Sequence, residues 1–67
     1  MADKADTLTT IRKRAERYAA EETPVGDYKA ERLNHFAEML ERDTLTAREA
    51  VYATNVVIRE KVTVASR

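Results

Sequence analysis

The side chains best suited to recognition chemistry form a row near the end of the chain. Spacings of four, three and four residues separate Arg48, Tyr52, Asn55 and Arg59. Such spacings place side chains on one face of a helix. Arginine and asparagine hydrogen-bond guanine and adenine edges in the major groove of DNA, whereas tyrosine and arginine are enriched at hot spots of protein–protein interfaces. The row therefore fits two functions, binding of a protein partner and reading of DNA.

The segment that carries this row has apolar residues on two sides. The main apolar stripe, at helical spacing, consists of Ala50, Val51, Thr54, Val57 and Ile58. The opposite side carries Tyr52 and Val56. A helix that is apolar on two sides packs against something beyond its own chain, unless the second side is only the apolar surface that any small bundle exposes. We expect a homodimer through this helix and partner binding by five residues: Arg48, Tyr52, Asn55, Val56 and Arg59.

A cluster of basic residues lies near the start of the chain, between residues 12 and 17. Two pairs at i,i+4 spacing are expected to neutralise part of it: Arg12 with Glu16, and Arg17 with Glu21. Lys13 and Arg14 remain as candidate contacts to DNA phosphates. The whole chain carries 12 Lys and Arg against 12 Asp and Glu. This balance favours a solvated, salt-bridged face over a surface that grips nucleic acid.

His35 is the single histidine, with Glu31 four residues before it and Glu38 three residues after it. This spacing is compatible with a metal ion on a helix. Helical metal sites, however, draw ligands from several elements, and the sequence shows no second cluster. We therefore expect a solvated histidine, with no metal and no cofactor. We also expect no catalytic site, because the chain has no cysteine, no serine before Ser66 and no glycine-rich phosphate loop.

Three amphipathic helices are expected to position these residues. One glycine and one proline in 67 residues disfavour an all-β fold, which needs turn residues about every 8–12 positions. Apolar residues recur at helical spacing over about 7–22, 27–42 and 46–62, and residues 63–67 form a tail. The expected fold is an all-α three-helix bundle, a single domain over 1–67. Its expected core consists of Leu8, Ile11, Ala15, Tyr18, Leu33, Phe36, Ala37, Leu40, Val51, Val57 and Ile58.

The tetrapeptide Asp-Thr-Leu-Thr occurs twice, starting at Asp6 and at Asp43. The residues that follow the two copies do not align, and their apolar positions differ, so we reject an internal repeat. Both copies are interpreted as helix starts, because threonine and aspartate cap helix N-termini. In the first copy the expected cap is Asp6 or Thr7, and the expected cap of the middle helix is Asp27.

The second copy predicts a capping box, in which Thr46 and Glu49 each accept a backbone N–H of the other. Leu45 and Ala50 are placed to form a small hydrophobic staple across it. The residues at 45–49, Leu-Thr-Ala-Arg-Glu, also resemble the opening of the helix-turn-helix domain in LuxR-type regulators. The resemblance covers neither a Gly-containing turn nor a recognition helix. We assign it to the shared capping box and carry no function across.

These observations lead to one preferred function and two alternatives. We expect a small non-catalytic adaptor or inhibitor that binds another protein, of the kind that phages and mobile elements encode. The first alternative is a dimeric helix-turn-helix-like regulator that reads DNA with the third helix, and the second is a small structural subunit of a larger assembly. The N-terminus lacks an apolar run, and no stretch approaches the roughly 18 apolar residues of a membrane span. We therefore expect a cytoplasmic protein.

Overall fold

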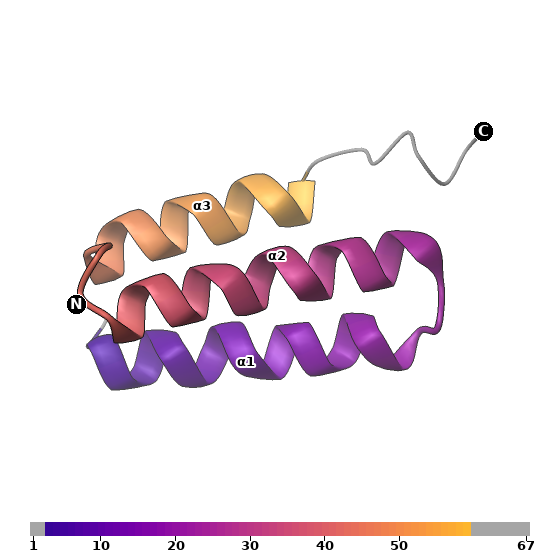
Figure 1. Ribbon diagram of the computed structural model, residues 1–67, viewed down its shortest axis with the longest axis horizontal. Coiled ribbons are helices and arrows are strands. Elements are labelled where there is room, and N and C mark those ends of the chain that lie inside the picture. The colour runs from indigo at the N-terminus through magenta and orange to yellow at the C-terminus, as the bar shows by residue number, and fades with distance from the viewer. Residues whose placement is uncertain (1–2, 60–67) are drawn as a thin grey trace.

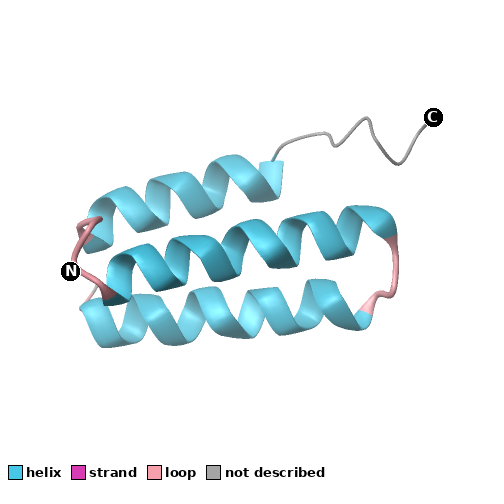
Figure 2. Cartoon of the chain, in the orientation of Figure 1, coloured by secondary structure: helices cyan, strands magenta, loops and turns pink. Residues whose placement is uncertain are grey.

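Three helices make up the described part of the chain, residues 3–59 of a computed structural model (Figure 1). They are α1, Lys4–Ala20; α2, Pro24–Glu41; and α3, Ala47–Arg59. Consecutive helices lie side by side and run in opposite directions, joined by short turns (Figure 1). No strand occurs between residues 3 and 59 (Figure 2). The expected all-α class and the three-helix arrangement are confirmed.

The helix bounds differ from the expected ones by up to three residues. α1 and α2 each begin three residues earlier than expected, at Lys4 and Pro24, for reasons of capping described below. α3 begins at Ala47, one residue after its expected start. Residues 60–62 of the expected third helix and the expected tail, 63–67, lie outside the described part of the chain.

The core takes apolar side chains from all three helices. The buried apolar residues are Ile11 and Ala15 of α1, Ala30, Leu33, Ala37 and Leu40 of α2, and Ala50 and Val57 of α3. Leu8, Tyr18, Phe36, Leu45 and Ala47 are partly buried and pack against this cluster. Four of the eight buried residues are alanines, which let the helix backbones approach closely. The larger side chains of Ile11, Leu33 and Leu40 fill the space that remains.

Val51 is not a core residue, contrary to the expectation from the sequence, because 38% of its surface is exposed. The buried stripe of α3 consists of Ala50, Thr54 and Val57, and Val51 lies about 90° from the middle of that stripe. α3 packs mainly on α2 and less on α1. Ile58, on the same border of the stripe, is half-buried.

Thr23, and not the expected Asp27, caps the N-terminus of α2. The Thr23 hydroxyl accepts the backbone N–H of Gly26 at 2.9 Å, and Pro24 takes the first helical position, where a missing N–H is no loss. Asp27 lies in the first turn, where its negative charge complements the helix dipole. The turn before this cap is made by Glu22, whose φ of 53° is in the left-handed region.

Gly26 has a packing role. It lies inside α2, and it does not adopt a positive φ. A Cβ atom at this position would overlap the backbone carbonyl oxygen of Tyr18 and would come within 2.9 Å of the Thr23 hydroxyl. Glycine therefore allows the first turn of α2 to pack directly on the last turn of α1.

α1 begins at Lys4, with Asp3 at its N-cap position and the Thr7 N–H donating to the Asp3 carbonyl at 2.9 Å. The expectation that Asp6 or Thr7 caps this helix is wrong. Thr7 is buried and shares the inward face of α1 with Ile11, so the core stripe includes a polar residue beside Leu8. The first Asp-Thr-Leu-Thr copy is thus helix interior.

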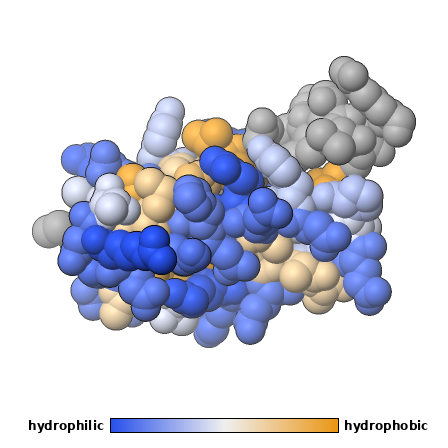
Figure 3. All heavy atoms as spheres, viewed as in Figure 1, coloured by the Kyte–Doolittle hydropathy of each residue, from blue (hydrophilic) through white to orange (hydrophobic). Residues whose placement is uncertain are grey.

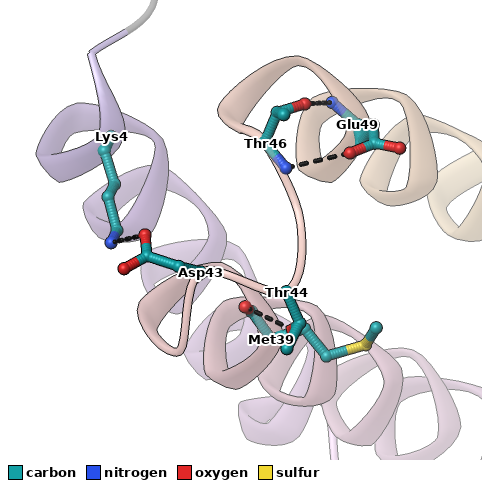
Figure 4. Close-up of polar contacts among 6 residues, drawn as sticks. All are labelled: Lys4, Met39, Asp43, Thr44, Thr46 and Glu49. Atoms are coloured by element: carbon teal, nitrogen blue, oxygen red, sulfur yellow. Dashed lines mark hydrogen bonds and ion pairs between the residues drawn. The ribbon is translucent and has the colours of Figure 1, made fainter.

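The second copy forms the link from α2 to α3 (Figure 4). Asp43 adopts φ 60° and donates its N–H to Leu40 O at 3.1 Å, while the Thr44 N–H donates to Met39 O at 2.8 Å. These two bonds constitute a Schellman motif, which closes the C-terminus of α2. The Asp43 carboxylate also accepts from Lys4 Nζ at 2.6 Å, so it ties the start of α1 to the end of α2.

Candidate functional site

A complete capping box fixes the start of α3, as the sequence predicted (Figure 4). The Thr46 N–H donates to Glu49 Oε1 at 3.0 Å, and the Glu49 N–H donates to Thr46 Oγ1 at 3.1 Å. Hydrogen bonding with Thr46 lowers the pKa of the Glu49 carboxyl below its usual value. The bond from the Thr46 backbone has the larger effect, and the bond with the Thr46 side chain has the smaller one. Leu45 packs partly buried against the core, and Ala50 is fully buried in it. The staple between these two side chains stays a prediction.

The buried stripe of α3 determines which of its residues face outward. Ala50, Thr54 and Val57 point into the bundle, so the opposite side of the helix faces solvent. All five residues predicted to bind a partner are exposed there. We call this surface the outer face of α3, and its members are Arg48, Tyr52, Asn55, Val56 and Arg59.

Apolar exposure in the described part of the chain concentrates on α3. The exposed large hydrophobic residues are Tyr28, Val51, Tyr52 and Val56, and three of these four belong to α3. Tyr52 is 72% exposed and Val56 is 47% exposed, and the two lie one helical turn apart. Polar side chains dominate the view in Figure 3, where one patch of strongly apolar surface lies at the upper, α3 edge. The outer face thus presents an apolar pair on a polar molecule.

Two arginines flank this apolar pair. Arg48 precedes Tyr52 by one turn, and Arg59 follows Val56 by about one turn. Neither arginine is within 4 Å of a carboxylate in the part of the chain described. Asn55 lies beside them with its side chain exposed. The outer face therefore offers two cationic groups and an amide around an apolar centre.

The basic stretch of α1 is arranged differently from the sequence expectation. Lys13 and Arg14 are exposed. Arg12 pairs with Glu41 of α2 at 3.0 Å, and within residues 3–59 neither of the two predicted i,i+4 pairs comes within 4 Å. The pairing of Arg12 across the helices is a tertiary contact, so the sequence of α1 alone could not indicate it.

Two shallow hollows lie on α1 and α2. The first, of about 230 Å³, is lined by Arg14, Arg17, Tyr18 and Glu21. The second, of about 320 Å³, is lined by Glu31, Arg32, Asn34, His35 and Glu38. The second hollow brings together the three side chains considered for a metal ion, yet no group of three metal-ligating side chains is assembled among the described residues.

Lys29 is a positioning residue that the sequence did not reveal. Its Nζ lies 5.1 Å from the ring centroid of Tyr18 in α1 and donates to the backbone carbonyl of Ile58 in α3 at 3.4 Å. A cation near the last carbonyls of a helix is favourable, because these carbonyls carry partial negative charge. Lys29 thereby connects all three helices near the end of α3. Its role depends on side chains far away in sequence, so no local pattern could indicate it.

Comparison with protein-family models, with curated proteins and with solved structures gave no match. None of the three helices described is long and apolar enough to cross a lipid bilayer. The functional interpretation therefore rests on the surface of the molecule itself.

Proposed function

We propose that the protein is a small non-catalytic adaptor or inhibitor that binds a protein partner through the outer face of α3. One observation carries this proposal: Tyr52 and Val56 are adjacent, apolar and exposed, although the buried stripe of the same helix already satisfies the core. Apolar side chains on a solvent-facing helix are typical of a surface that a partner covers.

The outer face supplies both an anchor and orienting charges. Tyr52 is the anchor, since a tyrosine buries a large area on binding and loses little conformational freedom. Arg48 and Arg59 are eleven residues apart, which corresponds to roughly 16 Å along the helix. They would pair with carboxylates of the partner on either side of the apolar centre, while Asn55 would add hydrogen bonds. The charged side of α1, with Lys13 and Arg14, would form a rim for a large partner.

The proposal includes self-association through α3 and a place among the small accessory proteins of phages or mobile elements. The size of the core supports self-association. A chain of 67 residues has a core near the lower limit for independent stability, and association is one common way to supplement it.

A second candidate function is DNA recognition by α3, because Arg48, Asn55 and Arg59 share one exposed face. The arrangement of the helices favours the first proposal. In a helix-turn-helix the two helices meet at about 90–120°, whereas α2 and α3 lie alongside each other and run nearly antiparallel (Figure 1). The balanced charge also gives little general attraction to phosphates.

Affinity purification from the native cell, with and without nuclease, tests the proposed function. We expect nuclease-resistant recovery of one protein by the wild-type chain and its loss with Tyr52→Ala plus Val56→Ala. Tyr28→Ala is the matched control, because Tyr28 is an exposed tyrosine on α2, and it should retain the partner. Equal recovery by both variants would show that the outer face is not the binding surface.

Titration with random duplex DNA at low salt separates the two candidates. The adaptor proposal expects no binding at high protein concentration. Binding that weakens steeply with added salt and with Arg48→Ala plus Arg59→Ala would favour the DNA-binding regulator instead.

A further inference from the structure

We infer that the first occupant of the outer face of α3 is the same face of a second copy of this chain, packed antiparallel about a two-fold axis. This inference rests on the proposed function, since it uses the same surface, and it specifies the geometry of the self-association. A two-fold interface uses one patch twice, so the patch must be complementary to itself. The outer face of α3 meets that condition.

The centre of the patch lies opposite Thr54, which points into the core. In an antiparallel dimer with its two-fold axis at that point, each residue of one copy faces a residue of the second copy. The two facing positions lie equally far from position 54, on opposite sides of it. Tyr52 then faces Val56 of the second copy, and Val56 faces Tyr52. The exposed apolar pair of each outer face, Tyr52 and Val56, is covered by this exchange.

The same arrangement pairs opposite charges. Glu49 and Arg59 also lie equally far from position 54. Glu49 of one copy therefore faces Arg59 of the second copy, and Arg59 faces Glu49. One oxygen of the Glu49 carboxylate accepts the Thr46 N–H, and the other oxygen points away from that bond (Figure 4). This second oxygen remains available as an acceptor for a guanidinium group.

A parallel arrangement would lack this complementarity. It would set each residue against its own equivalent, so that Arg48 would face Arg48 and Arg59 would face Arg59. Like charges in such proximity repel. The carboxylates needed to neutralise these arginines would have to come from outside the interface. Charge thus selects the antiparallel arrangement of the two helices.

The contact of a single helix face is small, so the dimer should be weak and dependent on protein concentration. Because it covers Tyr52 and Val56, it excludes the proposed partner while it lasts. Partner binding would therefore require the dimer to dissociate.

Sedimentation equilibrium on the full chain tests the inference. We expect a monomer–dimer equilibrium for the wild type, and Tyr52→Ala plus Val56→Ala should weaken it by at least about tenfold. Tyr28→Ala should leave it unchanged, and circular dichroism should show that both variants remain helical. A wild type that is monomeric up to about 1 mM, or a dimer that the double substitution does not weaken, would overturn the inference.

The charge pairing has its own test. Arg59→Glu places a carboxylate opposite Glu49 of the second copy and should weaken association at low salt. Arg17→Glu, the same substitution at an exposed position of α1, is the control and should have no such effect. Equal effects of the two substitutions would contradict the pairing.

Cysteine cross-linking determines the direction of the two helices, because the natural chain has no cysteine. A mixture of Tyr52→Cys and Val56→Cys chains should form the mixed disulfide in excess over either symmetric one under mild oxidation. Disulfides require Cα atoms within about 7 Å, and the antiparallel arrangement brings position 52 closest to position 56. Predominance of symmetric disulfides, or no disulfide, would contradict it.

The outcomes also separate this inference from the proposed function. A chain that stays monomeric but captures a protein through Tyr52 retains the adaptor proposal and loses the dimer. A chain that dimerises as described but captures no protein retains the dimer and loses the adaptor proposal.

Discussion

Gly26 and Thr54 show how single positions determine the packing of this small bundle. Gly26 is the only glycine of the chain, and its missing side chain leaves room for the Tyr18 carbonyl at the junction of α1 and α2. Thr54 presents the opposite situation, because its hydroxyl is buried in the core and makes no hydrogen bond between residues 3 and 59. Gly26 allows close packing because it has no side chain, whereas Thr54 places a hydroxyl group in the core without a hydrogen-bond partner among residues 3–59.

Gly26→Ala should destabilise the fold by about 1–3 kcal/mol, because the added Cβ forces the two helix ends apart. The intrinsic preference of alanine for helices, about 1 kcal/mol, acts in the opposite direction and is already outweighed by the overlap. Urea denaturation measures the difference. Asn34→Ala, at an exposed position of the same helix, should be neutral or slightly stabilising. A gain in stability from Gly26→Ala would show that the helices separate easily.

Thr54→Val should stabilise the fold by about 1 kcal/mol, because valine has the same shape and removes a buried hydroxyl without a partner. The matched control is Thr10→Val on the exposed side of α1, which should change the free energy of unfolding by no more than about 0.5 kcal/mol. Thermal unfolding of both variants checks the result. A clear loss of stability in Thr54→Val would mean that its hydroxyl is hydrogen-bonded in solution.

The ends of the helices carry much of the specific polar chemistry of this chain. α1 and α2 both terminate through a residue with positive φ that is not glycine, Glu22 and Asp43. Such residues are strained there, because the Cβ atom crowds the backbone. α3 begins with a reciprocal capping box between Thr46 and Glu49. The strained ends of α1 and α2 and the capped start of α3 can therefore be tested separately.

Glu22→Gly should stabilise the fold by about 0.5–1 kcal/mol, since it relieves the left-handed strain at the end of α1. Its neighbour supplies the control, because Glu21 has φ −70° and ψ −21°, an ordinary helical conformation. Glu21→Gly should instead destabilise the fold, through the greater freedom of the unfolded chain. Chemical denaturation compares the two. The same sign for both substitutions would argue against strain at Glu22.

The capping box predicts a pH dependence of stability. Because hydrogen bonds from Thr46 lower the pKa of Glu49 in the folded state, the ionised carboxylate stabilises the fold at pH values above the unfolded pKa, about 4.3. This contribution is lost as the pH falls through the lower, folded-state pKa. Glu49→Gln keeps the cap geometry but removes this part of the pH dependence. Glu31→Gln, on an exposed glutamate of α2, is the control, and thermal unfolding from pH 7 to 3 at low protein concentration measures both.

The three helices do not pack equally. α1 and α2 pack extensively on each other, and α3 has a smaller interface with them. α1 and α2 share the largest interface, and α3 packs mainly on α2. Within residues 3–59, α3 is also the shortest helix, with 13 residues, and it contributes two buried apolar residues to the core, Ala50 and Val57. A short helix with a small interface depends on tertiary contacts for its stability. The same small interface leaves its outer face free for a partner.

Amide hydrogen exchange should therefore be faster in the interior of α3 than at Ile11 or Leu33 in dilute solution, because α3 can open without the other two helices. Protection of α3 should rise with protein concentration if a second copy covers its outer face. Equal protection in all three helices at every concentration would contradict both expectations.

The sequence predicted the existence of all three helices because apolar spacing is a local property. It also predicted the Thr46–Glu49 box and the exposure of Arg48 and Tyr52, since a cap fixes where a helix begins and its stripe fixes which side faces inward. The starts of α1 and α2 were wrong. Thr7 is a polar residue in a buried stripe. Thr23 is the N-cap of α2 and is followed by proline at the first helical position, whereas the apolar spacing indicated a start at Asp27.

Only the tertiary structure decided which border of each stripe is covered. Val51 was predicted in the core and is exposed, because it lies to the side of the α3 stripe that packs on α2 and α1. The cross-helix partners of Arg12 and Lys29 were likewise undetermined, since they join residues 29 positions apart. The sequence by itself thus determined the three helices and the outward direction of the α3 row. The packing of the helices decided which apolar residues stay exposed, because burial is set by neighbours that are distant in the chain.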